Sequence, residues 1–370
     1  KNLYLYRSSK QSFDLKRFQT DKISTVDGVT RLYRMKKRLL ASLLNLLGVV
    51  GLFIWFRRLF KKEIIVLAYH RILSTDENSP YQYDEELISA DSKEFKWQIN
   101  FLKKHFDVIN FAELSKRLAD HKKLTGRELL ITFDDGFSDN YSNAFPILKA
   151  ENVPATFYIS TDYIGVTQTF WFNEIVHSIK TAEQLSFTLG DEQYDFEPTA
   201  SNREKVIQLV LDKLKQVSNQ KRLSTIESLY KDLNFNTDNT PASELPMTWD
   251  NVVEMSGNNM EIGSHSVSHP ILSKLDASEL EHEIKHSKQH IELMTNKPCL
   301  SIAYPVGGED AFTDNVESQS KIAGYEFGLS YISGINDVEA LDMHSLKRMH
   351  VERYIDKEEF KMMLYFPELY

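Results

Sequence analysis

From residue 63 onward, short apolar runs alternate with segments whose apolar residues recur every three or four positions. The runs are rich in β-branched and aromatic residues, which is typical of buried strands, and the periodic segments predict amphipathic helices. The predicted strands cover residues 63–69, 128–133, 155–160, 260–264, 299–305 and 326–330. The predicted helices cover residues 92–106, 143–152, 248–256, 277–294 and 315–324. This alternation predicts a parallel β/α fold, either a barrel or an open sheet.

The alternation is interrupted between residues 165 and 246. This segment opens with the aromatic stretch FWFNEIVHSIK and continues through the polar, helix-prone stretch NREKVIQLVLDKLKQVSN. It predicts a mainly helical insertion between two β/α units that forms a wall or a lid over one face. Trp171 and Phe172 at its start have two interpretations, a platform for a sugar ring or aromatic core at the base of the insertion, and we favour the core.

An apolar run near the N-terminus, LLASLLNLLGVVGLFIWF at residues 39–56, has basic residues on both sides. As a helix it is roughly 27 Å long, close to the thickness of the hydrocarbon core of a bilayer. We therefore expect residues 35–62 to form a membrane-associated helix that spans the bilayer or lies in its interface, and a packed helix of the globular part is the alternative. Residues 1–34 form a polar extension that we expect to be disordered or, because Met35 resembles a natural start, untranslated.

Charge is distributed unevenly along the chain, which has 370 residues and a net charge of −9. Residues 1–62 hold 15 Lys/Arg and 3 Asp/Glu, whereas the rest of the chain holds 29 and 50. A basic N-terminus favours contact with an anionic surface, and the acidic body argues against a nucleic-acid partner. A single cysteine, Cys299, excludes an intrachain disulfide framework.

Polar side chains suited to chemistry follow four of the predicted strands. In parallel β/α folds, ligands bind where the strands end at their carboxyl edge, so these residues are expected to meet. They are His70, Asp134 with Asp135, His265 with His269, and Tyr304 with Pro305.

Two histidines four positions apart and a pair of carboxylates predict an open metal site. Spacing of this kind lets His265 and His269 point the same way, and an added aspartate completes a three-ligand Zn²⁺ site. Gly136 lets the chain turn at once, so Asp134 and Asp135 both face the mouth of the barrel or sheet. One carboxylate would bind the metal, and the other would take a proton from the water that the metal activates. The simpler interpretation, an Asp-Gly turn, leaves the cost of adjacent charges unexplained.

Three motifs, TFDDGFSDNY, EIGSHSVSHP and AYPVGG, resemble the polysaccharide deacetylase family in their order and spacing. The resemblance runs from VLAYHRI to LKRMHVER and implies that residues 63–370 form a distorted (β/α) barrel that uses a divalent metal, usually zinc, with cobalt as a substitute. It also implies that Asp134 is the catalytic base and that Asp135, His265 and His269 are metal ligands. Members of the family remove acetyl groups from N-acetylated sugars.

The third motif departs from the family pattern and defines a variant with Ala-Tyr-Pro. Many members have an arginine where Ala303 stands, and that arginine orients the catalytic aspartate; our candidate for its replacement is Arg348. In members of the family the residue after the proline donates its backbone N–H to the oxyanion. The resemblance therefore implies this role for Val306, and a backbone donor requires no particular side chain. The general acid has no clear match, and His344 and His350 are its candidates.

His70 and Tyr304 are expected to contact substrate, although His70 has a structural role as an equal alternative. The histidines at positions 282, 286 and 290 do not predict a metal site, because they lie opposite the apolar face of their helix.

The sequence thus predicts a metal-dependent hydrolase that acts on an N-acetylated polysaccharide or lipid-linked glycan at a membrane, which we expect to be a bacterial inner membrane. A glycan-binding protein without catalysis is the alternative. A glycosidase is a poorer one, because adjacent aspartates do not readily flank a bond from opposite sides.

Overall fold

The structure is a computed structural model that describes residues 62–75, 80–120, 124–237 and 240–369. The predicted extension at residues 1–34 and the apolar run at residues 39–56 lie outside the described residues. Within the described ranges, no helix combines the length and the apolar character needed to cross a bilayer.

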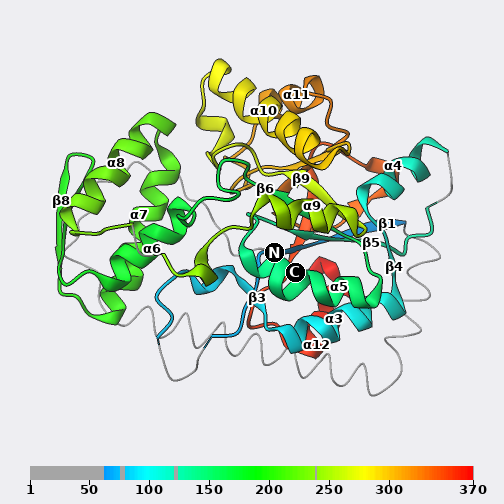
Figure 1. Cartoon of the computed structure of the whole chain (residues 1–370), viewed down its shortest axis with the longest axis horizontal. Coiled ribbons are helices and arrows are strands. Elements are labelled where there is room, and N and C mark those ends of the chain that lie inside the picture. The colour runs from blue at the N-terminus through cyan, green and yellow to red at the C-terminus, as the bar shows by residue number, and fades with distance from the viewer. Residues whose placement is uncertain (1–61, 76–79, 121–123, 238–239, 370) are drawn as a thin grey trace. The chain divides into compact units, whose positions relative to one another are not determined.

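A closed barrel of seven parallel strands forms the centre of the fold (Figure 1). Around the barrel the strands follow one another as β1 (Glu63–Tyr69), β13 (Leu346–His350), β11 (Phe327–Ser333), β10 (Ser301–Ala303), β9 (Met260–Ser264), β6 (Ala155–Ile159) and β5 (Glu128–Phe133). β1 pairs with β13 on one side and with β5 on the other, and this last pairing closes the sheet. The predicted β/α barrel is confirmed, and the open sheet is excluded.

Short segments extend this sheet at its margins. β12 (Asn336–Asp337) pairs antiparallel with β1, and β4 (Asp107–Val108) pairs parallel with β5. A separate pair joins β2 (Arg71–Ile72), directly after β1, to β3 (Ile88–Ala90).

The barrel strands are apolar because side chains are buried on both faces of the sheet. All six residues of β5 are buried, as are the last six of β1. Helices cover the outside of the barrel: α3 (Ser92–His105), α4 (Phe111–Ala119), α5 (Phe145–Glu151), α9 (Trp249–Gly257), α10 (Ala277–Thr295), α11 (Asp314–Ile322) and α12 (Lys357–Tyr365). Side-chain caps fix where several of them begin: Asp276, for example, accepts from the backbone N–H groups of Ser278 and Glu279 in a full capping box.

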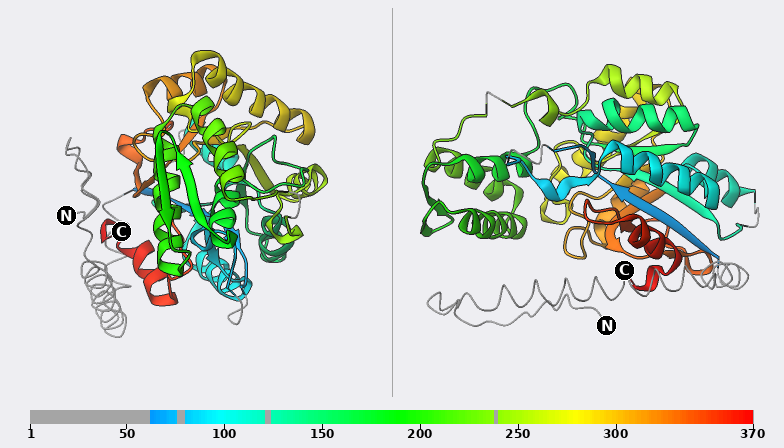
Figure 2. Two further views of the ribbon diagram at one scale, coloured as in Figure 1. Left: turned by 90° about the vertical axis from the view of Figure 1, so that its left-hand side faces the viewer. Right: turned by 90° about the horizontal axis from the view of Figure 1, so that it is seen from below.

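The insertion forms a body with a hydrophobic core of its own, beside the barrel in the views of Figure 1 and Figure 2. It contains α6 (Trp171–Thr181), α7 (Ala200–Gln216), α8 (Asn219–Asp232) and the short 3-10 helix η4 (Ala242–Glu244). It also contains an antiparallel hairpin of β7 (Leu185–Leu189) and β8 (Glu192–Phe196), which the sequence analysis did not predict. The helices and the hairpin share one core, so neither part of the insertion stands alone.

Candidate active site and metal centre

The two adjacent aspartates lie where β5 ends. Asp135 and Gly136 both have a left-handed backbone, with φ of 73° and 95°, so the chain turns directly after Asp134. A side chain at position 136 would also meet Ile159 at 3.0 Å, and only glycine combines this backbone with this close approach. The turn keeps both carboxylates at the carboxyl edge of the barrel, where each is 2% exposed.

Asp135, His265 and His269 form one buried cluster. The Asp135 Oδ1 atom lies 3.5 Å from His265 Nε2 and 3.3 Å from His269 Nε2, and one donor atom from each residue falls within 4.8 Å of the others. Across residues 62–75, 80–120, 124–237 and 240–369, it is the only group of three or more metal-ligating side chains this compact.

The donor set of this cluster fits a divalent metal. One carboxylate and two imidazoles are the ligands of an open zinc site, with a position left for water or substrate. Asp135 Oδ2 is buried and has no hydrogen-bond partner among the described residues, as expected of an oxygen that serves a metal. Burial alone would raise the pKa of Asp135, but hydrogen bonds from His265 and His269 outweigh it and lower that pKa, so the carboxylate is ionised.

The two histidines are held in different ways. His265 Nδ1 lies 2.8 Å from the Ala303 carbonyl oxygen, an interaction that leaves Nε2 as the metal-binding nitrogen. His269 Nδ1 is buried without a hydrogen-bond partner in the described part of the chain. The orientation of the His269 ring must therefore come from its backbone and from packing.

Arg348 holds Asp134 in a buried, bidentate ion pair. Its Nη1 and Nη2 donate to Asp134 Oδ1 and Oδ2 at 2.7 and 2.8 Å, and its Nε donates to the Ser330 carbonyl at 2.8 Å. Burial opposes ionisation of Asp134, but Arg348 and then His265 outweigh it, so the pKa of Asp134 is lowered. The third motif has no arginine that could hold Asp134, and Arg348 of β13 makes this contact instead.

Unfavourable backbone conformations concentrate at this edge of the barrel. Eight described residues other than glycine have a positive φ, and four are asparagines, which adopt this conformation readily. The other four are Asp135, Ser266, His269 and Val306. Such strain persists only where the surroundings impose it, and it clusters at functional sites.

Three further candidates lie at the same edge. His70 follows β1 and meets the Tyr331 ring edge-on, with the ring centroids 5.5 Å apart. His350 at the end of β13 stacks on the Tyr331 ring, with the ring centroids 3.6 Å apart. Burial, followed by Arg348 and His70, lowers the pKa of His350 to about 3. Val306 lies just after β10, whose Ala303 carbonyl holds His265.

Two candidates lie elsewhere. The Tyr304 side chain is fully buried and donates its hydroxyl to the His344 carbonyl at 2.9 Å. This placement does not favour contact with substrate, which stays a prediction. Gly328 permits this placement, because a Cβ there would meet the tyrosine hydroxyl. His344 precedes the amino end of β13, and the charges that act on it are those of Lys321 and Asp342 rather than of the cluster.

Sequence reasoning missed the side chains that support the loop carrying His265 and His269. Glu283 on α10 accepts from the backbone N–H groups of Val267 and Ser268 at 2.7 and 2.9 Å. Trp171 and Phe172 of the insertion also reach the loop: the indole donates to the His269 carbonyl, and the Phe172 ring lies 4.9 Å from the His269 ring. The sequence singled out Trp171 and Phe172 as aromatic core or as a sugar platform, but not as support for this loop. For Glu283, its helical spacing with buried neighbours was the available signal.

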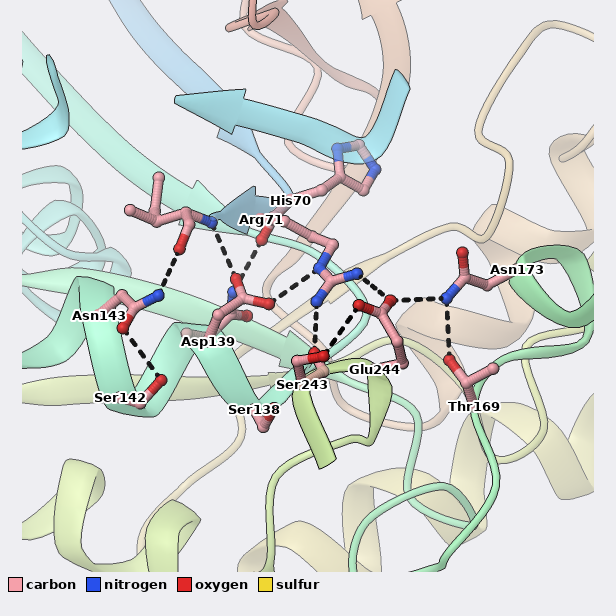
Figure 3. Close-up of polar contacts among 12 residues, drawn as sticks. His70, Arg71, Ser138, Asp139, Ser142, Asn143, Thr169, Asn173, Ser243 and Glu244 are labelled. Atoms are coloured by element: carbon pink, nitrogen blue, oxygen red, sulfur yellow. Dashed lines mark hydrogen bonds and ion pairs between the residues drawn. The ribbon is translucent and has the colours of Figure 1, made fainter. Parts of the chain in front are cut away.

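A second buried charge cluster, centred on Arg71, was also missed (Figure 3). Arg71 donates to Asp139 Oδ2 at 2.8 Å, to Glu244 Oε2 at 2.5 Å and to the Ser243 carbonyl at 2.6 Å. Asp139 belongs to the loop after the two aspartates, and Glu244 lies at the far end of the insertion. The Arg71 cluster therefore connects β2, which directly follows the first barrel strand, with the aspartate loop and the insertion.

Comparisons with known proteins place these residues in a family. The sequence profile of the polysaccharide deacetylase family matches residues 121–328. A poly-β-1,6-N-acetyl-D-glucosamine N-deacetylase of Staphylococcus epidermidis is 31% identical over 113 residues, which are 29% of this chain and 39% of the relative. A putative polysaccharide deacetylase of Bacillus subtilis is 30% identical over 112 residues, 30% of this chain and 37% of the relative. The chain thus matches less than half the length of these curated relatives.

Solved structures share the fold at low sequence identity. A Streptococcus pyogenes deacetylase in complex with acetate has a TM-score of 0.54 at 18% identity, over 82% of this chain and 98% of that one. IcaB from Ammonifex degensii has a TM-score of 0.51 at 16% identity, over 82% and 95%. At these identities the likeness extends to the fold alone.

Proposed function

Because the chain belongs to the polysaccharide deacetylase family, we propose that it is a divalent-metal-dependent hydrolase that removes acetyl groups from N-acetylated sugars of a glycan. The observation that carries this proposal is a single buried site in which a three-residue ligand set adjoins an ionised carboxylate, Asp134, held by Arg348. The name of the staphylococcal relative makes a β-1,6-linked N-acetylglucosamine polymer the first substrate to test.

Asp135, His265 and His269 are the residues that would hold the metal. A divalent cation there would polarise the acetyl carbonyl and lower the pKa of a bound water toward about 7. Their donor set favours Zn²⁺, with Co²⁺ as a spectroscopic substitute.

Asp134 is the group that moves the proton. It is ionised at neutral pH because Arg348 lowers its pKa, and each of its oxygens keeps a lone pair for the proton of the attacking water. The same low pKa makes protonated Asp134 a strong acid, able to pass that proton to the leaving nitrogen. His350, with a pKa of about 3, is neutral at pH 7 and has no extra proton to give.

The remaining candidates surround this pair. Val306 has a left-handed backbone, with φ of 64°, shortly after β10, and we assign its backbone N–H the role of oxyanion donor. His70, partly exposed at the end of β1, is the histidine we assign to the wall of the substrate site. Arg348 acts as a positioning residue, because a bidentate contact fixes both the place and the tilt of the Asp134 carboxylate.

A purely glycan-binding role gains no support from the site. Its two arguments are the missing arginine at position 303 and the uncertain general acid. The contact of Arg348 with Asp134 weakens the first, and the proton transfer proposed for Asp134 answers the second. A protein without catalysis would have no reason to keep a buried carboxylate–arginine pair next to a ligand set, since such pairs are costly to desolvate.

We extend the proposal to the membrane through residues 35–62. Their basic and apolar composition would bring the enzyme to the surface on which a lipid-linked or surface-bound glycan lies. Sedimentation of the full chain with anionic phospholipid vesicles, beside a chain that begins at Glu63, tests this extension, and equal sedimentation of the two would contradict it.

Acetate release tests the hydrolase. The protein is stripped with a chelator, refilled with Zn²⁺ or Co²⁺, and incubated with β-1,6-N-acetylglucosamine oligomers, chitin oligomers and peptidoglycan fragments. Asp134→Asn removes the proton acceptor and is expected to abolish release, whereas Asp107→Asn, which changes a partly exposed aspartate paired with Arg117, retains it.

Metal-dependent acetate that disappears only in Asp134→Asn supports the proposed function. Binding of one metal equivalent without acetate from any of these glycans would favour the binding protein. A protein that binds no divalent metal would contradict the proposal.

A further inference from the structure

The two proposed histidine ligands differ in how their rings are oriented. Histidine ligands usually donate their second ring N–H to a carbonyl or carboxylate, which fixes the ring. His265 makes this contact with Ala303, but His269 Nδ1 is buried and has no such partner among the described residues. His269 also has a left-handed backbone, with φ of 54°, a conformation that costs free energy for a residue other than glycine or asparagine.

Two donors from the insertion meet at the His269 carbonyl oxygen. Trp171 Nε1 lies 3.1 Å from it and Arg222 Nη1 lies 3.3 Å from it. On the other side of the same residue, the His269 backbone N–H donates to Ser266 Oγ at 3.1 Å. Hydrogen bonds therefore hold the peptide group on each side of the strained His269. The insertion supplies the donors on the carbonyl side.

Arg222 is an unusual residue for a purely structural role. It is 3% exposed, and within the described part of the chain no carboxylate lies at ion-pair distance from it, although the charge of Glu283 acts on it from farther away. Its contacts are the His269 carbonyl, Asn219 Oδ1 at 2.8 Å and the face of the Trp171 ring at 4.6 Å. Burying a cation with no carboxylate in direct contact is costly, and packing of the insertion core alone would be served equally well by an apolar side chain.

The aromatic start of the insertion adds packing to these hydrogen bonds. The rings of Phe172 and Phe170 lie 4.9 and 6.2 Å from the His269 ring. Trp171, between them in the sequence, belongs to the hydrophobic core of the insertion. The orientation of His269 is thus linked to the folded core of the insertion.

We propose that the insertion completes the metal centre, with Trp171 and Arg222 as positioning residues that lock the backbone of His269 and thereby aim its ring at Asp135 and His265. This inference rests on the proposed metal-dependent function and deepens it. It makes the insertion part of the machinery that sets metal affinity, in addition to any part it has in contact with the glycan.

The test measures Zn²⁺ affinity of the full chain by competition with a chromophoric chelator, and the Co²⁺ absorption spectrum as a report on ligand geometry. Trp171→Phe keeps a ring in the insertion core and removes only the N–H donor, and Arg222→Met keeps the stem and removes the charge. Arg222→Lys restores the charge and one donor. Arg203→Met is the matched control, because Arg203 also donates to carbonyls of the insertion, those of Ile179 and Ala182, without touching His269.

We expect Trp171→Phe and Arg222→Met each to raise the Kd for Zn²⁺ by about tenfold, and the double variant by up to about a hundredfold, with a changed Co²⁺ spectrum. Arg222→Lys is expected to recover part of the affinity, and Arg203→Met to keep the wild-type Kd even where it lowers the melting temperature. Wild-type Kd and spectrum in both Trp171→Phe and Arg222→Met would overturn this inference and leave the proposed function standing. A wild-type chain that binds no Zn²⁺ or Co²⁺ would overturn both.

Discussion

Replacement of Arg348 by methionine is the sharpest test of the buried pair. Arg348 and Asp134 are 0% and 2% exposed at their side chains, and two hydrogen bonds of 2.7 and 2.8 Å join them. Methionine fills much of the space of the arginine stem but leaves the Asp134 carboxylate buried without its cation. Breaking a buried pair in this way costs about 3–5 kcal/mol of unfolding free energy.

A double-mutant cycle separates this cost from loss of packing. Asp134→Asn alone leaves Arg348 buried without its counter-charge, and we expect a cost of similar size. In the double variant neither charge is left unpaired, so the two single costs do not add, and the coupling free energy is on the order of 3 kcal/mol. Because Arg348 lowers the pKa of Asp134 in the folded protein, the pair stabilises at neutral pH and loses its contribution as the pH falls through that lowered pKa.

Urea unfolding at pH 7 in the presence of EDTA, followed by tryptophan fluorescence, measures the four corners of the cycle without a contribution from metal. Arg353→Met is the control, because its pair with Glu85 is 26% and 36% exposed and is worth about 0–1 kcal/mol. Single costs of Arg348→Met and Asp134→Asn that sum to the cost of the double variant would refute the reasoning, as would an Arg348→Met variant no less stable than the control.

Three other predictions concern the charges around the site. Burial raises the pKa of Glu174 to about 7, so the folded protein loses stability as the pH rises from about 4.5 through 7. Glu174→Gln still accepts from Tyr230 but cannot ionise. Its unfolding free energy should therefore exceed that of the wild type by on the order of 2–3 kcal/mol above pH 8. Urea midpoints from pH 5 to 9 measure this, and a pH-independent difference would contradict it. Arg71→Met leaves Asp139 and Glu244 buried without a cation and should lower the unfolding free energy by roughly 3–5 kcal/mol; an unchanged urea midpoint would count against it. Zn²⁺ at 100 times its Kd should raise the unfolding free energy by about 2.7 kcal/mol over EDTA, visible as a higher melting temperature, and equal melting in both buffers would argue against the metal site.

The barrel was predictable because its strands carry a local signal. The apolar runs at residues 63–69, 128–133 and 260–264 coincide with β1, β5 and β9. Burial on both faces requires apolar residues at successive positions, so a few adjacent residues are enough to indicate such a strand. β13 lacked such a signal, because Lys347 and the buried Arg348 interrupt its apolar residues.

The hairpin of the insertion was missed although a signal was present. Leu185, Phe187 and Leu189 alternate with exposed or half-buried residues, and Gly190, with φ of 70°, begins the connection to β8. Alternation with a glycine turn is typical of a hairpin, but the neighbouring helix-prone sequence dominated the interpretation of the whole segment.

The sequence was enough to place the ends of the strands at one edge of the barrel. It did not reveal the long-range contacts that hold the side chains there. Asp134, Asp135, His265 and His269 follow directly from their positions after predicted strands. The bond from Arg71 to Glu244 spans 173 positions, and no local pattern pairs two such residues. The same holds for Trp171, which the sequence analysis assigned to the aromatic core, and for Arg222, which it did not single out; the fold brings both to the His269 carbonyl.

The place of the insertion in the chain explains why it touches the site at all. β6 and β9 pair in register from Ala155–Met260 to Ile159–Ser264, so the barrel is continuous without the segment between them. That segment leaves β6 at its carboxyl end, and in a parallel barrel every such connection opens on the face where ligands bind. Its two ends stay together there, because the Gly165 N–H donates to the Met247 carbonyl at 2.9 Å. A long insertion at this point must therefore lie beside the proposed metal ligands, and its contacts with His269 follow from the topology rather than from an added domain that happens to lie nearby.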